Sequence, residues 1–164
     1  MTASGLCLPA FTEVDRIAFA ALHALRHILR NDARPAHVFE LARLLETRVD
    51  HAELWKLWLN AHHPEVRRLQ LIAFRFAEEW FGCRLPQVIA QECEKLPTPV
   101  SSWLRSFAWS PVANLTRPNK DVLWLHLTLL TSRRDRWKIA GGRLIPLKIP
   151  HERLDSRLDR KSVV

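Results

Sequence analysis

Apolar residues recur every three or four positions along most of this chain, and prolines stand between the apolar stretches. The clearest example is Ile17–Leu45, where one stripe, Ile17–Ile28, ends near Asn31 and a second follows Pro35. This spacing predicts amphipathic helices, and proline suits the first turn of a helix because that position has no use for an N–H donor. The pattern therefore predicts an all-α chain.

Over the whole chain, this pattern of apolar stripes and prolines predicts a single irregular bundle of about six to eight helices joined by short loops. The expected helices are Thr12–Arg30, Pro35–Thr47, His51–Ala61, Pro64–Phe81, a short one after Pro86 that ends near Cys93, Ser101–Ala108, and Asp121–Ser132. Trp109–Asn119 carries two prolines and is expected to be irregular. The last segment is rich in β-formers and could be a buried strand, but its helical surroundings favour a helix.

The chain changes character at Arg133, where it becomes strongly basic. Gly141–Gly142 predicts a turn, and the proline-stiffened Leu144–Pro150 predicts extended chain. We expect one helical domain over residues 1–150 and a charged, frayed C-terminal tail over 151–164.

Charge and cysteine content indicate which partners and which cellular compartment to expect for this protein. Lysine and arginine number 25 against 17 acidic residues, a net charge of +8 that favours an acidic ligand or possible nucleic-acid partner. Three cysteines do not form a disulfide framework, which favours the cytoplasm. The longest apolar run, Val122–Leu130, is far shorter than the ~20 residues of a membrane span. The first residues lack a basic region followed by a long apolar run, so we expect no signal peptide.

Cationic residues gather in two places that could bind an anion or a partner. The first cluster lies around the turn between the first two helices and comprises Arg26, His27, Arg30 and Arg34. The second surrounds Trp137 and comprises Arg133, Arg134, Arg136 and Lys138. The ordinary alternative for the second cluster is a solvated helix end.

His23 and His27 are four residues apart, the spacing of two metal ligands on one helix. No ligand motif follows them, so His62, His63 or Cys83 would have to complete a site in space. We therefore expect no metal and no cofactor, with His23 half-buried and His27 solvated.

Arg30 and His37 offer an enzymatic alternative. Their R-x₆-H spacing resembles the loose motif of the higher-eukaryote-and-prokaryote-nucleotide-binding (HEPN) ribonucleases. In such a metal-independent ribonuclease the histidine would act as acid or base on the RNA 2′-hydroxyl, and the arginine would steady the phosphate. The plain alternative is a cation at a helix C-terminus and a surface histidine.

The tryptophans divide into two groups. Trp55, Trp58, Trp80 and Trp124 fall on apolar stripes and are expected in the core, whereas Trp109 and Trp137 stand in irregular or basic surroundings and are expected to be exposed. Core packing is therefore favoured over base stacking for the first group.

Several segments together resemble the helical C-terminal half of the bacterial "uncharacterised nucleotidyltransferase" family. They are Leu8–His27, Arg34–Glu46, Val49–Trp58, Phe81–Pro86 and, more faintly, Ser132–Pro146. In that family such a region accompanies an α/β catalytic core. One departure is Glu40-Leu41-Ala42, where the family pattern has Asp-Leu-Ala.

The catalytic hallmarks of that core are missing from this chain. A nucleotidyltransferase core uses a Gly-Ser turn for the triphosphate and a D-x-D pair for Mg²⁺, and the sequence contains neither. The resemblance thus implies a non-catalytic accessory domain that positions a substrate or partner, with a separate nucleotidyltransferase-like chain as the expected partner. A simple protein-interaction module is a third possibility.

Overall fold

The computed structural model describes residues 10–115 and 118–144. They belong to two compact units, Met1–Leu129 and Leu130–Val164. Within the described ranges every regular element is a helix and no strand is present, so the expected all-α class is confirmed. The boundary expected at residue 150 and the expected charged tail, 151–164, lie outside the described residues.

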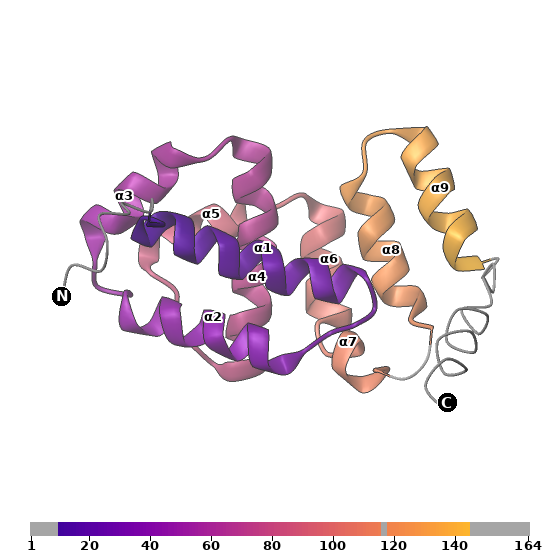
Figure 1. Ribbon diagram of the computed structural model, residues 1–164, viewed down its shortest axis with the longest axis horizontal. Helices are drawn as coiled ribbons and strands as arrows, with labels where there is room; N and C mark the ends of the chain where they lie inside the picture. The colour runs from indigo at the N-terminus through magenta and orange to yellow at the C-terminus, as the bar shows by residue number, and fades with distance from the viewer. Residues whose placement is uncertain (1–9, 116–117, 145–164) are drawn as a thin grey trace, which may run out of the picture. The chain divides into compact units, whose positions relative to one another are not determined.

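The first unit is built from eight helices in its described part (Figure 1). They are α1 (Glu13–Leu29), α2 (Pro35–Thr47), α3 (Ala52–Ala61), α4 (Pro64–Phe81), α5 (Gln87–Glu94), α6 (Thr98–Phe107), α7 (Ser110–Ala113) and α8 (Lys120–Leu129). None of the described helices is long and apolar enough to cross a bilayer.

Helix α4 is the centre of the first unit. It packs against α1, α2 and α5, and its buried face includes Ile72, Phe74 and Phe76, each without exposed surface. Gly82 ends the helix with a φ of 64°, a left-handed conformation that glycine adopts without a Cβ clash. Helices α3 and α8 pack on α1, and α8 also contacts α6 and α7.

Helix α1 begins with a capping box. The Asp15 N–H donates to Thr12 Oγ1 at 3.2 Å, and the Thr12 N–H donates back to the Asp15 carboxylate at 3.2 Å. Its buried stripe, which includes Ile17 and Ile28, packs on α2, α3, α4 and α8. The opposite face of α1 is left for solvent or a ligand.

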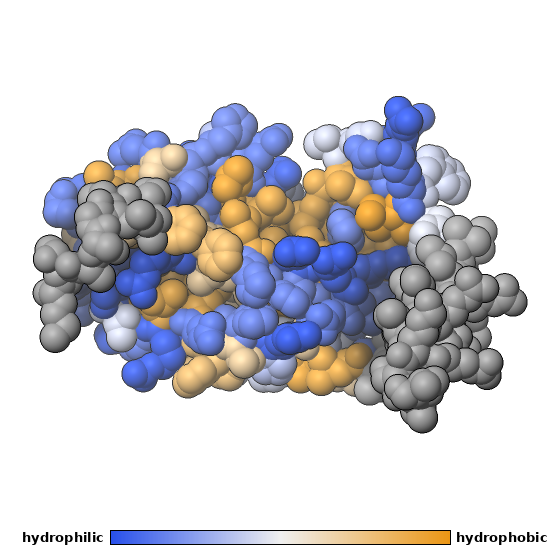
Figure 2. Space-filling view, viewed as in Figure 1, coloured by the Kyte–Doolittle hydropathy of each residue, from blue (hydrophilic) through white to orange (hydrophobic). Residues whose placement is uncertain are grey.

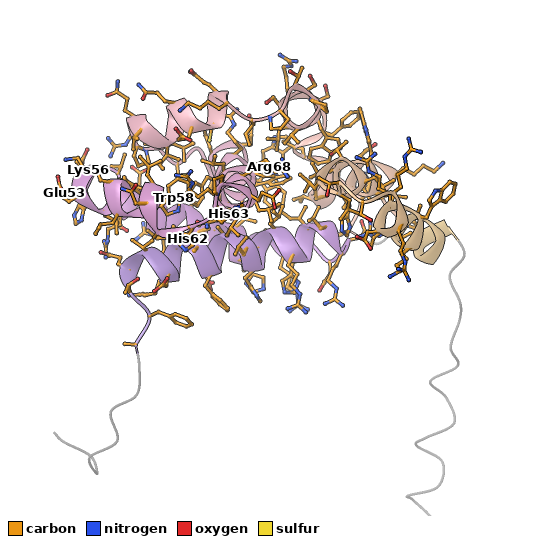
Figure 3. All side chains as sticks on the ribbon, turned by 90° about the horizontal axis from the view of Figure 1, so that it is seen from above. Glu53, Lys56, Trp58, His62, His63 and Arg68 are labelled. Atoms are coloured by element: carbon orange, nitrogen blue, oxygen red, sulfur yellow. The ribbon has the colours of Figure 1, made fainter. Side chains whose placement is uncertain are left out.

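Four buried tryptophans join the helices of the first unit. Their indole N–H groups donate to Arg48 O from Trp55 (2.8 Å), Gln70 Oε1 from Trp58 (2.7 Å), Ala108 O from Trp80 (2.8 Å) and Asp121 O from Trp103 (2.8 Å). Figure 3 shows Trp58 on α3, with Glu53 and Lys56 on the same helix. Satisfying each indole matters because a buried donor without an acceptor costs about 1–3 kcal/mol.

The core placement of Trp124 was wrong. Its side chain is 48% exposed, because Val122 and Leu125 are the residues of α8 that face the core. Trp124 instead packs on the edge of Phe107, with ring centroids 5.7 Å apart. Trp109 and Trp137 are exposed as expected, at 54% and 79%.

Two expectations for the later half of the chain also differ from the structure. Helix α6 starts at Thr98, not Ser101, because Pro99 occupies its first turn, where proline is tolerated. Helix α7 forms within the stretch expected to be irregular, and the buried Asn119 amide donates to Ser110 O at 2.8 Å. The β-rich segment is the helix α8, as favoured.

The second unit contains α9 (Arg133–Leu144) in its described part. At the start of α9 the Asp135 N–H donates to Ser132 Oγ at 3.3 Å. The turn expected at Gly141–Gly142 was wrong, because the helix continues through both glycines and neither has a positive φ. The segment expected to be extended lies mostly beyond the described residues.

Candidate functional site

A row of aromatic rings, called here the aromatic row, begins at Phe11, just before α1, and continues along the outward face of that helix with Phe19, His23 and His27. Residues three or four apart on a helix lie on one face. The ring centroids are 6.0 Å apart for Phe11–Phe19, 5.7 Å for Phe19–His23 and 4.7 Å for His23–His27. Phe19 is 60% exposed, so this row is surface and not core.

His37 of α2 meets the end of this row. Its ring centroid lies 4.6 Å from that of His23 and 4.9 Å from that of His27. One ligand atom from each of the three imidazoles lies within 4.8 Å of the others, and all three residues are partly buried. These three residues are called the histidine cluster below.

The turn between α1 and α2 brings His37 to α1. Arg30 caps α1, and Asn31 adopts a left-handed conformation with φ 61°, which asparagine tolerates better than most residues. The Asp32 N–H then donates to His27 O at 3.0 Å. Pro35 opens α2, which places His37 in its first turn.

Asp32 links the histidine cluster to an arginine. Its Oδ2 lies 3.1 Å from His27 Nδ1 and 3.5 Å from Arg34 Nη2. The hydrogen bond from His27, with the charge of Arg34, lowers the pKa of the Asp32 carboxyl. Burial, and then the neighbouring charges of His37, His27 and Arg26, lower the pKa of His23 below its usual 6.5 and favour its neutral form.

The expected cationic residues of the turn, Arg26, His27, Arg30 and Arg34, do gather here and are called the basic turn. Its arginines are exposed. Arg34 shares the Asp32 carboxylate, whereas neither Arg26 nor Arg30 is in an ion pair with any described residue. Figure 2 shows a hydrophilic region along the C-terminal part of α1, beside hydrophobic surface toward its start.

Helix α2 adds an apolar area to the same unit. Phe39 is 50% exposed, and its ring meets that of Phe81 at a centroid distance of 5.4 Å. A shallow depression of about 410 Å³ lies beside it, lined by Phe39, Glu40, Arg43, Leu44 and Thr47. Exposed aromatic rings of this kind are enriched where proteins meet partners.

The second expected cluster lies on α9 and is described by itself. Arg133, Arg134, Arg136 and Lys138 are all exposed around Trp137. The Arg136 Nε donates to Leu130 O at 2.7 Å, so this side chain folds back on the start of its own unit. The other three side chains present their charges to solvent, as in a solvated helix end.

The residues expected to complete a metal site if one formed, His62, His63 and Cys83, do not join the histidine cluster. His62 and His63 lie at the turn between α3 and α4 (Figure 3), where His63 Nδ1 accepts from the Glu65 N–H at 3.4 Å. Cys83 and Cys93 are buried, and burial raises the pKa of their thiols to about 11 and about 12. Neither offers a reactive thiolate near neutral pH.

His37 is the residue whose role the sequence left open. It was considered as an RNA-cleaving partner of Arg30, but its ring contacts two histidines in the structure. The ribonuclease alternative stays a prediction. Pro35 is the sequence signal that could have placed His37 in the first turn of α2, because a proline at the start of a helix fixes which residues form that turn.

No model of a known protein family matches this chain, and neither does any curated protein or solved structure. The family resemblance therefore stays a prediction. A fold alone does not specify a function, so the functional argument rests on the groups gathered along α1 and α2.

Proposed function

We propose that this chain is a non-catalytic helical domain that positions an anionic, nucleotide-like substrate or a partner for a nucleotidyltransferase-like core. One observation carries the proposal: Arg26 and Arg30 are exposed at the basic turn with no ion-pair partner among the described residues. A guanidinium presents its donors in a fork that matches two phosphate oxygens. Two guanidinium groups without ion-pair partners are therefore suited to bind a chain of phosphates.

The start of α2 adds to the positive potential of the basic turn. Cations near the end of α1 are explained by the helix dipole, whose C-terminal end is negative. That account does not extend to Arg34, which stands at the positive end of α2. This helix has no side-chain cap and no acidic residue in its first turn. The uncapped N-terminus of α2 and Arg34 thus favour an anion at the same turn.

The catalytic part must come from elsewhere under this proposal. Nucleotidyl transfer needs carboxylates that hold Mg²⁺ between phosphate oxygens, and the chain has no Gly-Ser and no D-x-D sequence. The exposed rings of Phe11, Phe19 and Phe39 support a contact with such a core, since aromatic side chains contribute much of the energy of protein interfaces. We expect the core to be α/β and to carry those carboxylates.

Calorimetric titration with inorganic triphosphate and with ATP tests the proposal. The test variant is Arg26→Gln/Arg30→Gln. The matched control is Arg16→Gln/Arg43→Gln, which removes the same charge from exposed positions of α1 and α2 outside the turn. We expect the test variant to bind at least about tenfold more weakly, because each charge-assisted hydrogen bond contributes about 1.5–3 kcal/mol. The control should bind within about twofold of the natural chain.

Two outcomes would contradict the proposal. Equal weakening in both variants would show that only the overall charge of the chain matters. No triphosphate binding by the natural chain would favour the simple interaction module, which has no reason to bind phosphate. Circular dichroism of each variant confirms that the helices are intact before the affinities are compared.

A further inference from the structure

The proposed function rests on the arginines of the basic turn and assigns no role to the imidazoles of the histidine cluster, although His27 belongs to both groups. We propose that His23, His27 and His37 form a binding site for a divalent transition-metal ion of the zinc class. This inference stands independently of any nucleotide or nucleotidyltransferase partner. It rests on the geometry of three imidazoles, on the carboxylate behind one of them and on the chemistry of the donor set.

The three imidazoles are close enough to share one ion. Zinc–nitrogen bonds of about 2.0–2.1 Å in a tetrahedron place two ligand nitrogens about 3.4 Å apart. One ring nitrogen of each histidine already lies within 4.8 Å of one from each of the other two, so these three nitrogens need to approach by at most about 1.4 Å. The three side chains are only partly buried, which leaves them room for the rotations that this approach requires.

The backbone supports this arrangement at both helices. His23 and His27 are one helical turn apart on α1, so their relative position is fixed by the helix. His37 is held in the first turn of α2, which follows the hydrogen-bonded turn at Asp32. Two rigid elements therefore supply the ligands, as precise metal sites require.

Asp32 selects the nitrogen that His27 offers. A histidine that binds a metal commonly donates its other ring N–H to a carboxylate, which fixes the tautomer and the ring orientation. His27 Nδ1 lies 3.1 Å from Asp32 Oδ2, so Nδ1 carries the proton and Nε2 is left as the ligand. Arg34 in turn holds the Asp32 carboxylate, at 3.5 Å.

The donor set selects the class of metal. Imidazole nitrogens suit Zn²⁺, Cu²⁺, Ni²⁺ and Co²⁺, whereas Mg²⁺ and Ca²⁺ require oxygen ligands. Three protein ligands leave one tetrahedral position for water or an exogenous anion. The arginines of the basic turn oppose a bound cation, but they are exposed and screened by solvent. The same arginines favour an anion in the fourth position.

The test uses the untagged full chain on a Cys7→Ser background, which removes the thiol outside the described residues. ZnCl₂ is titrated by calorimetry, and CoCl₂ by the visible absorption that tetrahedral cobalt produces. The variants are His37→Ala, which removes a ligand, and Asp32→Asn, which leaves all three ligands in place. The matched control is His51→Ala, an exposed histidine outside the cluster.

We expect one equivalent of Zn²⁺ to bind, with tetrahedral cobalt absorption. Asp32→Asn should weaken binding by roughly 10–100-fold, His37→Ala by at least as much, and His51→Ala by less than about twofold. The inference is overturned if His37→Ala binds zinc as tightly as the natural chain does. It is also overturned if the natural chain binds no zinc, or if cobalt is octahedral. Because Asp32→Asn keeps the three ligands, its result is informative even if His37→Ala loses helix content.

Discussion

At the scale of single residues, Trp103 connects two helices through one buried side chain. It has no exposed surface on α6, and its indole N–H donates to Asp121 O at the start of α8 at 2.8 Å. Its ring also lies 5.9 Å from that of Phe76 on the central helix. The side chain thus contributes both apolar burial and a satisfied hydrogen bond.

We predict that Trp103→Phe lowers the free energy of unfolding by about 2–4 kcal/mol, because it removes the hydrogen bond and leaves a cavity. Trp109→Phe is the matched control, since Trp109 is 54% exposed. The control should stay within about 0.5 kcal/mol of the natural chain. Urea denaturation followed by circular dichroism measures both, and equal effects would contradict the packing described here.

The histidine cluster shows what residue spacing can and cannot specify. The four-residue interval between His23 and His27 places both on one face of a helix, and this was predictable. The approach of His37 depends on the path of the turn, including the left-handed Asn31 at φ 61°. A single backbone angle of this kind is not encoded in hydrophobic periodicity, so the third histidine was not predicted as a ligand.

At the scale of elements, α9 and α4 use glycine in opposite ways. Gly142 lies within α9 without a positive φ, and an added Cβ would meet nothing within 4 Å. Gly82 follows α4 with a φ of +64°, where any L-residue is strained. The same glycine-to-alanine change is therefore expected to have opposite signs at the two positions.

We predict that Gly142→Ala stabilises α9 by about 0.5–1 kcal/mol, which slows hydrogen exchange of its amides by roughly two- to fivefold. Gly82→Ala should lower the free energy of unfolding of the chain by about 1–2 kcal/mol. Hydrogen exchange measures the first effect, and urea denaturation measures the second. Faster exchange in α9 after Gly142→Ala would show that the chain turns at Gly141–Gly142, as the sequence suggested.

The elements that the sequence predicted best are those with strong apolar stripes and a marked start or end. Helices α1, α2 and α4 begin or end within about two residues of expectation, as periodic patterns allow. The sequence did not predict the start of α6 or the short α7, because Pro97, Pro99 and Pro111 are equally compatible with a break between helices. Proline in a first turn is compatible with a helix. Whether a helix forms after such a proline then depends on tertiary contacts, such as the hydrogen bond from Asn119 to Ser110 O.

At the scale of the whole molecule, a net charge of +8 favours acidic ligands without saying where they bind. The first unit has at least two cationic areas. One is the basic turn. The other is a depression of about 200 Å³ near the start of α4, lined by Pro64, Arg67, Arg68, Leu71, Glu92, Lys95 and Leu96. In the second area Lys95 already pairs with Glu92, and an Arg67 guanidinium N–H donates to Leu59 O. The basic turn therefore has more guanidinium N–H donors free to bind an anion than the depression near the start of α4 has.

The most direct test of the proposed function is an NMR titration of the ¹⁵N-labelled chain with inorganic triphosphate, read amide by amide. Binding at the basic turn predicts that the largest chemical-shift changes fall between Arg26 and His37. They should saturate and be absent in Arg26→Gln/Arg30→Gln. Changes centred on Arg67, Arg68 and Lys95, or spread evenly over the surface, would contradict the account.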